Sequence, residues 1–515
     1  MTWDDDVERL NQRRETAKQM GGKEAVQKMH DRGRLTVRER IDTLTDSDSF
    51  REIGRIAGTT EDDHGTELFT PANAVVGTGK IGGRRAVICG DDFTLRGAAY
   101  TTTGLKKALY AEKLAIERRI PLVRLLDSGG ASIQGISGRR GQSGFDMTAA
   151  SQQTLLSVEA LATVPVVCAA LGAVAGFPAA RLVASHFSVM TGDAQVMTGG
   201  PALVERALGQ KITKEELGGA HLHSKSGVVD NIAKDEPALC AQITRFLSYL
   251  PSHSGQLAPM LKGSDPAGRA DEELLQIMPS RRRRAYDVRQ LLTRIVDHGS
   301  FFEKTPFYGR SMVTGLARLN GHSVGVMAND CMRDGGAMTA ESAQKVRRFI
   351  ELCDTFHLPM LSFIDQPGFM IGKAAEEAGT IRYGTETLFT AVQSRVPWLA
   401  IVLRKSFGVA QGIQLGPGAT VIAWPSAEVG SMPVEGGVAL GFRREIESAD
   451  DPAARRRELE DEMALGQSIF PRAEDFGIHD LIDPRETRVY AADWLDQVTP
   501  QLDPSQGPMK YSLRP

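Results

Sequence analysis

The 515-residue sequence is poor in cysteine and carries no large excess of charge of either sign. Its five cysteines, Cys89, Cys168, Cys240, Cys331 and Cys353, are scattered without a Cys-x-x-Cys pair, so neither a metal site nor a disulfide framework is predicted. We expect buried, reduced thiols in a cytoplasmic protein. The formal net charge is −3, which provides no positive field for nucleic acid or anionic lipid.

Segments typical of a signal peptide or a membrane span are also missing. Residues 1–6 are acidic and lack the basic and apolar regions of a signal peptide. Two uncharged runs, 160–180 and 406–427, have about the 20-residue length that spans a bilayer, but both contain internal prolines and glycines. Strands and loops in a buried core explain these runs better than lipid does, and no membrane partner is predicted.

Common catalytic motifs are absent as well. Ser128 and Ser132 do not lie in a Gly-x-Ser-x-Gly motif, and no P-loop or dinucleotide-binding glycine motif occurs. Asp127 and Asp365 could act as acids, but each follows a predicted strand, a position that favours helix capping. The chain therefore gives no sign of a nucleophilic triad or of nucleotide-driven chemistry.

An internal repeat is the clearest feature that the sequence does contain. Corresponding positions in the two copies are Gly83 and Gly321, Asp127 and Asp365, Gly130 and Gly368, and Gly176 and Gly408. The first three pairs share one offset (321 − 83 = 238), and the last has an offset six residues shorter (408 − 176 = 232). A register held over so long a stretch, with one six-residue deletion, indicates two homologous domains.

Each copy has the same predicted order of elements. An apolar strand precedes an amphipathic helix, which a proline ends, and a buried strand, another helix and a further strand follow. The predicted strands of the first and second copies lie at 86–89 and 324–327, at 122–126 and 360–364, and at 166–171 and 399–403. This alternation predicts an α/β fold of stacked ββα units.

The domain limits follow from the repeat. We expect an N-terminal domain over 1–262, a linker over 263–286 and a C-terminal domain over 287–515. The linker is rich in charge and in residues that break secondary structure. Its Arg281–Arg284 run is interpreted as solvated surface and not as a phosphate site.

Glycine turns that follow buried strands are the candidate functional site. Gly172–Phe177 stands in the first copy and Lys405–Gln411 at the matching place in the second, while Asp127–Ser132 forms a third such turn. Any one of them alone is better explained as an ordinary glycine turn. A matched pair, however, could present backbone N–H groups to two carbonyl oxygens, as a reaction that forms two oxyanions requires.

These motifs resemble the carboxyltransferase β subunits of propionyl-CoA carboxylase and related acyl-CoA carboxylases, within the crotonase-like superfamily. The resemblance covers nearly the whole chain. The matching segments are 32–42, 127–134, 198–201, 215–220, 226–228, 365–369, 404–408, 423–428 and 482–488. The resemblance implies an α/β chain with two homologous crotonase-like domains, each a ββα superhelix.

The resemblance also implies a reaction and its partners. The chain would transfer the carboxyl group of carboxybiotin to the α carbon of an acyl-CoA. Biotin would be carried on a separate biotin carboxyl carrier subunit, charged by a biotin carboxylase, and the chain would form a homo-hexamer, a trimer of dimers. No metal in this chain is implied.

Site residues are implied by the same resemblance. Paired backbone amides map to Gly176 with Phe177 and to Val409 with Ala410, the first pair serving the acyl-CoA and the second biotin. The substrate-binding positions implied are Gly129, Gly130, Ala131, Gly408, Gln411 and Gly412.

The sequence departs from the family at both turns. Gly176-Phe177-Pro178 replaces Gly-Gly-Ala, and Gly408-Val409-Ala410-Gln411 replaces Gly-Gly-Ala-Tyr. The new side chains restrict the backbone angles and the room for a ligand. Gly412 stands where the family often has Asp or a branched residue. We therefore predict that propionyl-CoA is not the preferred substrate.

Two other functions remain open. The carboxyltransferase subunit of a biotin-dependent acyl-CoA decarboxylase would run the same half-reaction in reverse. A catalytically impaired scaffold paralogue in a carboxylase complex would explain Phe177, Pro178 and Val409. A single-domain hydratase or isomerase of the crotonase type fits less well, because such a chain has about half this length.

Overall fold

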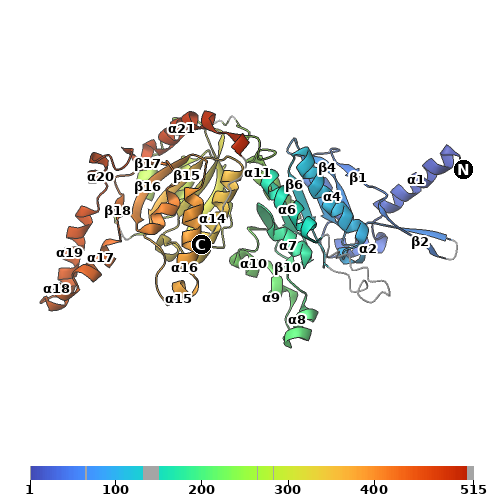
Figure 1. Ribbon diagram of the computed structural model, residues 1–515, viewed down its shortest axis with the longest axis horizontal. Coiled ribbons are helices and arrows are strands. Elements are labelled where there is room, and N and C mark those ends of the chain that lie inside the picture. Colours follow the sequence, from blue (N-terminus) through green and yellow to red (C-terminus); the bar gives the residue numbers. More distant parts are fainter. Residues whose placement is uncertain are drawn as a thin grey trace. The chain divides into compact units, whose positions relative to one another are not determined.

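The computed structural model describes residues 2–63, 66–130, 150–261, 263, 265–281 and 284–506. The chain divides into two compact units, Met1–Ser254 and Gly255–Pro515, and Figure 1 shows a sheet covered by helices in each. The predicted α/β class is confirmed. The division proposed from the repeat placed residues 263–286 in a linker, whereas here they group with the second unit.

The first unit is built on a seven-stranded sheet in the order β1-β4-β5-β6-β7-β9-β11. The β1–β4 and β4–β5 pairs are antiparallel and the others are parallel. The strands are β1 (Arg51–Ile53), β4 (Ala74–Ile81), β5 (Arg84–Asp91), β6 (Leu122–Leu126), β7 (Val166–Ala170), β9 (Phe187–Thr191) and β11 (Asn231–Ala233), with β2 (Gly58–Asp63), β3 (Thr66–Pro71), β8 (Ala173–Ala175) and β10 (Gln195–Met197) in two small ladders.

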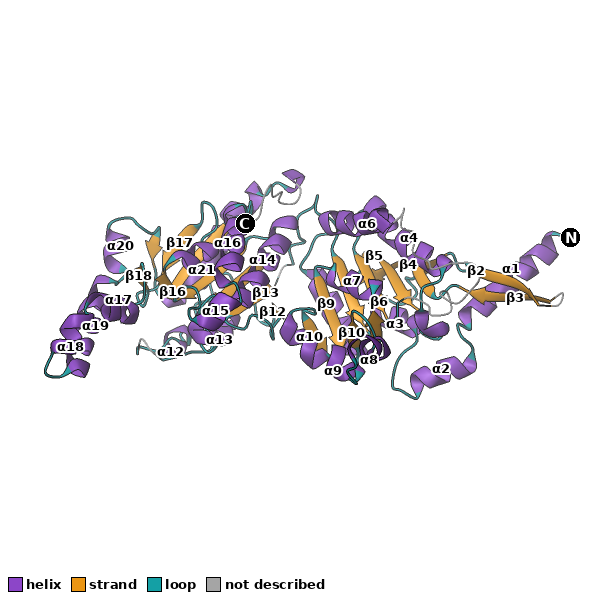
Figure 2. Cartoon of the chain, turned by 60° about the horizontal axis from the view of Figure 1, so that its bottom comes forward, coloured by secondary structure: helices purple, strands orange, loops and turns teal. Residues whose placement is uncertain are grey.

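The helices of the first unit lie partly on this sheet and partly beyond it, as Figure 2 shows. They are α1 (Trp3–Lys18), α2 (Lys23–His30), α3 (Val37–Leu44), η1 (Arg96–Ala98), α4 (Thr102–Arg118), α6 (Ala150–Thr163), α7 (Phe177–Val183), α8 (Pro201–Leu208), α9 (Lys214–Gly218), α10 (Ala220–Ser226) and α11 (Glu236–Ser248). Helix α4 begins where the Thr101 hydroxyl accepts the Gly104 N–H at 3.0 Å, and it ends before Pro121.

The second unit repeats the plan with the strand order β12-β13-β14-β15-β16-β17-β19, in which β18 also pairs with β16. Its strands are β12 (Phe302–Lys304), β13 (Met312–Leu319), β14 (His322–Asn329), β15 (Met360–Gln366), β16 (Trp398–Phe407), β17 (Thr420–Ala423), β18 (Glu428–Gly430) and β19 (Asp480–Leu481). Its helices are α12 (Leu274–Ile277), α13 (Val288–Ile295), η2 (Asp334–Gly336), α14 (Ala340–Thr355), α15 (Lys373–Glu377), α16 (Thr380–Val392), η3 (Val409–Gln414), α17 (Val434–Gly441), α18 (Arg443–Ser448), α19 (Pro452–Gly466), α20 (Phe470–Glu474), η4 (Pro484–Glu486), α21 (Thr487–Val498), η5 (Thr499–Gln501) and η6 (Pro504–Gln506).

Matching backbone hydrogen bonds confirm the predicted repeat. The Tyr100 N–H donates to the Gly130 carbonyl at 2.9 Å, and the Met338 N–H donates to the Gly368 carbonyl at 3.0 Å. Both members of the second pair lie 238 residues after those of the first (338 − 100 and 368 − 130). The long strand β16 takes the place of β7 and β8 together. The two units are therefore two copies of one fold.

Apolar strands explain why each sheet lies in a core. Every residue of β6, β7, β13 and β15 is buried, as expected of central strands covered on both faces. Four of the five cysteines are buried, Cys331 is half-buried, and all five are free. None of the helices in the described part of the chain is long and apolar enough to cross a membrane.

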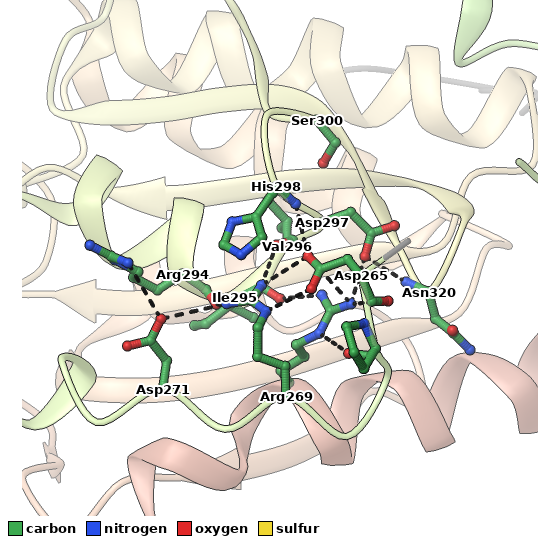
Figure 3. A network of polar contacts seen from close by, with 12 residues as sticks. Asp265, Arg269, Asp271, Arg294, Ile295, Val296, Asp297, His298, Ser300 and Asn320 are labelled. Atoms are coloured by element: carbon green, nitrogen blue, oxygen red, sulfur yellow. Dashed lines mark hydrogen bonds and ion pairs between the residues drawn. The ribbon is translucent and has the colours of Figure 1, made fainter. Parts of the chain in front are cut away.

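The segment that begins at residue 265 is fastened to the second unit by polar contacts (Figure 3). Arg269 pairs with Asp265 at 2.8 Å and donates to the carbonyl groups of Arg294 and Val296 at 2.6 and 2.9 Å. Because these contacts satisfy the carbonyls at the end of α13, they also cap that helix. Arg281, from the run interpreted as solvated surface, is exposed.

Candidate active site

In the first unit, the turn between β8 and α7 depends on Gly176. This residue has φ 66° and ψ −129°, a conformation that residues with a side chain rarely adopt. Its N–H donates to the Met197 carbonyl at 3.1 Å, which ties the turn to β10. The next N–H, that of Phe177, has no acceptor among the described residues. The turn therefore leaves the Phe177 N–H without an acceptor at the start of α7.

The predicted donor pair in this turn was Gly176 with Phe177. Because the Gly176 N–H already bonds Met197, it could serve a ligand only by sharing or giving up that bond. Pro178, the second residue of α7, has no N–H and so removes one of the donors that a helix start normally offers. The donor role of Gly176 stays a prediction, and Phe177 is the donor that the geometry leaves open.

The loop that follows β6 packs against the same turn. A Cβ on Gly130 would lie 2.6 Å from the Ala175 carbonyl oxygen, and its φ of 86° also favours glycine. The Ala175 N–H donates to the Ser128 carbonyl at 3.0 Å. The structure thus brings two predicted site residues, Gly130 and Gly176, into one small region.

Gly129 and Ala131 are the other predicted site residues of this loop. Gly129 is exposed, and its N–H lies 3.4 Å from the Gly97 carbonyl. Ala131 lies outside the described residues.

A buried ion network lies beneath the loop. Arg40 of α3 contacts Asp127 at 2.9 Å and Glu236 at 2.8 Å. Burial raises the pKa of Asp127, and the Arg40 charge opposes this shift. A Cβ on Gly172 would fall 2.0 Å from a carboxylate oxygen of Asp127, so a larger residue would push the network apart. Arg40 belongs to the segment 32–42 that carried the resemblance, and its contacts give that segment a physical role.

The equivalent turn of the second unit lies between β16 and η3. Gly408 has φ 64° and ψ −164°, and its N–H donates to the Gly430 carbonyl at 3.2 Å, as Gly176 donates to Met197. The N–H groups of Val409 and Ala410 have no acceptor within the described chain. Both members of this predicted pair are therefore open.

Side chains around the second turn show how the departures from the family are accommodated. The Val409 side chain is 66% exposed in its unit. Gln411 accepts a hydrogen bond from the Ser406 hydroxyl at 2.8 Å. A Cβ on Gly412 would lie 2.9 Å from the Leu388 side chain of α16, so Leu388 already fills the space beside this glycine. All the predicted residues of this turn lie together.

Asp365 pairs with an arginine of the neighbouring strand, whereas Asp127 pairs with an arginine of a helix. Arg404 of β16 contacts the Asp365 carboxylate at 2.8 Å, and the Lys405 N–H donates to it at 3.1 Å. Because both contacts come from the neighbouring strand, the carboxylate joins β15 to β16, and the capping role predicted for Asp365 is wrong.

Reasoning from the sequence missed the groups that hold the two Asp residues in place. The N–H of Asp127 donates to the Asp91 carboxylate at 3.2 Å, and the N–H of Asp365 donates to the Asn329 side chain at 3.0 Å. Asp91 and Asn329 are also 238 residues apart (329 − 91). Extending the repeat register to this strand end would have found them.

Two copies of one α/β unit, each with a glycine turn that leaves backbone N–H groups without an acceptor in that unit, define a two-domain α/β protein. Comparison with known proteins gives the family. The carboxyl transferase domain matches residues 28–497, and the chain belongs to this family. The predicted resemblance and the fold class of two homologous crotonase-like domains are confirmed.

Individual relatives span the whole of the match. The chain is 34% identical over 496 residues to the carboxyltransferase subunit of propionyl-CoA carboxylase from Haloferax mediterranei, covering 95% of each chain. It is 32% identical over 490 residues to the alpha subunit of methylmalonyl-CoA decarboxylase from Propionigenium modestum, covering 94% of this chain and 93% of the relative. The hexameric transcarboxylase 12S, solved with methylmalonyl-CoA, superposes with a TM-score of 0.87 at 30% identity, over 100% and 97% of the two chains.

The described residues contain no group of three or more His, Cys, Asp or Glu side chains placed to hold a metal ion.

Proposed function

We propose that this chain is the carboxyltransferase subunit of a biotin-dependent acyl-CoA carboxylase, which moves the carboxyl group of carboxybiotin to the α carbon of an acyl-CoA. Family membership supports the reaction class. The observation that carries the mechanism is the matched pair of glycine turns. Phe177 in one unit and Val409 with Ala410 in the other have N–H groups without an acceptor in their own unit.

The first turn would serve the acyl-CoA. Loss of the α-proton turns the thioester into an enolate, whose negative charge gathers on the carbonyl oxygen. The Phe177 N–H would donate to this oxygen. One lost oxyanion donor typically costs about 2.7–4 kcal/mol of transition-state stabilisation, so the position of this amide is a main determinant of rate.

The second turn would serve biotin. When bound, carboxybiotin would supply carbon dioxide and a nitrogen base for the α-proton, with negative charge on its ureido oxygen. Two adjacent donors, Val409 and Ala410, fit one such oxygen. Nothing in this scheme requires a side-chain acid or base, which agrees with the lack of a nucleophilic motif in the sequence.

The partners follow from the same scheme. We propose that a biotin carboxylase and a biotin carboxyl carrier subunit work with this chain, and that the chain assembles as a hexamer, a trimer of dimers. The hexamer of the 12S relative supports this assembly. The cytoplasmic location expected from the free thiols stays a prediction.

The acyl group is proposed to differ from propionyl. Phe177 and Val409 add side chains beside the proposed donors, whereas Gly412 removes one, so the walls of the site differ from those of the family at three positions. A panel of acyl-CoA substrates of increasing length and branching tests this. The highest kcat/KM on propionyl-CoA would contradict the proposal.

Decarboxylation is the second candidate, favoured by the 32% identity to the methylmalonyl-CoA decarboxylase subunit. It uses the same half-reaction in reverse, so both candidates need the same donors. Measuring transfer in both directions with the purified partner subunits separates them.

One assay tests the proposal as a whole. Purified chain is incubated with a radiolabelled carboxyacyl-CoA and free biotin, and the label transferred to biotin is measured. We expect transfer that saturates with both substrates. If the chain binds the partner subunits but transfers nothing under any condition, it is a scaffold and the proposed activity is wrong.

A further inference from the structure

A cluster of charged side chains is buried in the first unit, apart from the glycine turn. Glu112 of α4, Arg124 of β6 and Arg181 of α7 are each no more than 2% exposed. Glu112 contacts Arg124 at 2.8 Å and Arg181 at 2.9 Å. Although burial opposes ionisation, the two arginines hold the pKa of Glu112 below its ordinary value. The Glu112 carboxylate is therefore stabilised in its ionised form between the two arginines.

This cluster holds the C-terminal end of helix α7. Arg124 donates to the carbonyl groups of Arg181 and Ala184 at 3.0 and 3.1 Å, at the end of the helix where a positive charge is favourable. Arg181 donates from the helix itself to Glu112 at 3.0 Å. Helix α7 is thus joined to a strand and to another helix by charged groups.

Helix α7 also carries Phe177, whose N–H is the proposed donor to the acyl-CoA. Phe177 and Arg181 are four residues apart and so lie on the same face of the helix. The Tyr100 ring lies 6.1 Å from the Phe177 ring, and the Tyr100 N–H donates to the Gly130 carbonyl. Burial raises the pKa of Tyr100, and the charge of Arg181 opposes this shift.

The second unit shows that the fold does not need such a cluster. The residues equivalent to Glu112, Arg124 and Arg181 by the repeat offsets are Ile350, Ser362 and Ile413. These three are buried, and two of them are apolar. Buried ion groups are often no more stabilising than a well-packed apolar core, and the Nη1 atom of Arg181 has no hydrogen-bond partner among the described residues. Stability alone does not explain the charges.

We propose that Glu112, Arg124 and Arg181 are positioning residues that fix helix α7, and with it the Phe177 N–H, for the acyl-CoA half of the reaction. The inference rests on the proposed function. It adds that the biotin half, served by the second unit, does not depend on these charges. The cluster orients the donor and does not touch the reacting atoms.

Arg181→Lys is the first test, because it keeps the charge but removes the guanidinium group that contacts Glu112. Misplacing a positioned group by about 1 Å costs about 100-fold in rate, so we expect kcat to fall by about 10- to 100-fold. The KM for free biotin should stay within about twofold of the wild-type value. The assay is transfer from a carboxyacyl-CoA to free biotin by the full chain.

An inhibitor pair provides a readout that loss of stability would not imitate. A CoA thioether ending in a nitroalkyl group gives an anion that resembles the enolate, whereas CoA itself has no such group. The wild-type protein should prefer the nitroalkyl compound, and Arg181→Lys should reduce this preference by the same factor as kcat. CoA should inhibit both proteins equally. Glu112→Gln should behave in the same way as Arg181→Lys.

The matched control is Arg488→Lys in the second unit. Arg488 is 1% exposed and contacts Asp297, which is labelled in Figure 3, at 2.7 Å. The Arg488→Lys variant should lose about as much thermal stability as Arg181→Lys, while its inhibitor preference should stay unchanged. If this control lost the preference as well, or if folded Arg181→Lys and Glu112→Gln kept wild-type kcat and preference, the inference would be wrong. A wild-type chain without transfer would instead contradict the proposed function.

Discussion

The two units use one backbone plan but stabilise it with different side chains. Asp127 and Asp365 stand at equivalent strand ends, yet the first is held by Arg40 from a helix at the start of the chain and the second by Arg404 from the adjacent strand. Gly172 occupies the place that Arg404 has in the other copy (404 − 172 = 232). The two copies thus hold the equivalent carboxylate with arginines from different elements.

The comparison separates what the reaction needs from what each ligand needs. Both copies keep the glycine with positive φ and the amide bonded to a neighbouring strand, because these set the direction of the following N–H groups. The charges differ: the first unit buries a cluster around Glu112, and the second fills the same place with Ile350 and its neighbours. The backbone therefore provides the shared chemistry, and the side chains distinguish the two halves.

The largest effect is expected from Arg40→Met. This change leaves Asp127 and Glu236 buried without their cation, and removing one partner of such a network typically costs about 3–5 kcal/mol. Urea unfolding of the full chain, followed by a probe in each unit, measures it. The first unit should lose this stability and the second should not. An unfolding free energy within about 1 kcal/mol of wild type would show that the network is not needed.

Gly130→Ala should have the next largest effect. The added Cβ meets the Ala175 carbonyl at 2.6 Å and must displace the turn that carries Phe177. A shift of this kind should lower kcat for carboxyl transfer by about 100-fold. Gly192→Ala is the matched control, because this exposed glycine of the same unit has no atom within 4 Å of the added Cβ. Equal kcat for the two variants would argue that the loop after β6 does not position the donor.

The sequence allowed the turns to be located, because glycine is favoured where φ is positive, and the repeat showed which glycines correspond. Gly176 and Gly408 could be paired before any coordinates were known. The bond from Gly176 to Met197 could not be predicted, since no sequence pattern connects this turn with the short strand β10. The partner of Asp127 was equally hidden, as Arg40 lies 87 residues away.

One residue of the charged cluster is recognisable in the sequence. Arg124 interrupts the apolar strand Leu122–Leu126, and a charged residue inside a fully buried strand requires a partner. Its identity depends on how α4 and α7 pack, which a single sequence does not reveal. Patterns thus predict which residues are unusual, and the structure shows what they contact.

Phe177→Gly tests the difference between the first turn and its family. Glycine at this position removes the ring that packs near Tyr100 and opens space beside the proposed donor. One or a few carbon atoms in such a pocket are worth about 1–3 kcal/mol of discrimination, so kcat/KM for the preferred acyl-CoA relative to propionyl-CoA should change by about 10-fold or more. Val409→Gly, in the other turn, should change the KM for biotin instead. If the wild-type protein and Phe177→Gly had the same acyl preference, Phe177 would not line the acyl pocket.

The smallest effect concerns Asp91, where the second unit has Asn329. Burial raises the pKa of Asp91 to about 6, although Arg181 opposes the shift. Because this folded-state pKa lies above the ordinary value of 3.8, the folded chain holds the proton more tightly than the unfolded chain between these two values. The stability contributed by the protonated group is complete below 3.8 and is lost as the pH rises through 6.

Asp91→Asn copies the second unit and removes this titration while keeping an oxygen that can accept the Asp127 N–H. Between pH 4 and 7, the unfolding free energy of the variant should therefore decline less steeply than that of the wild-type protein. Asp365 and Arg404 are unchanged in the variant, so a probe in the second unit serves as the internal reference. Parallel pH profiles for the two proteins would mean that Asp91 stays ionised in the folded chain, and that the two strand ends are electrostatically more alike than their sequences suggest.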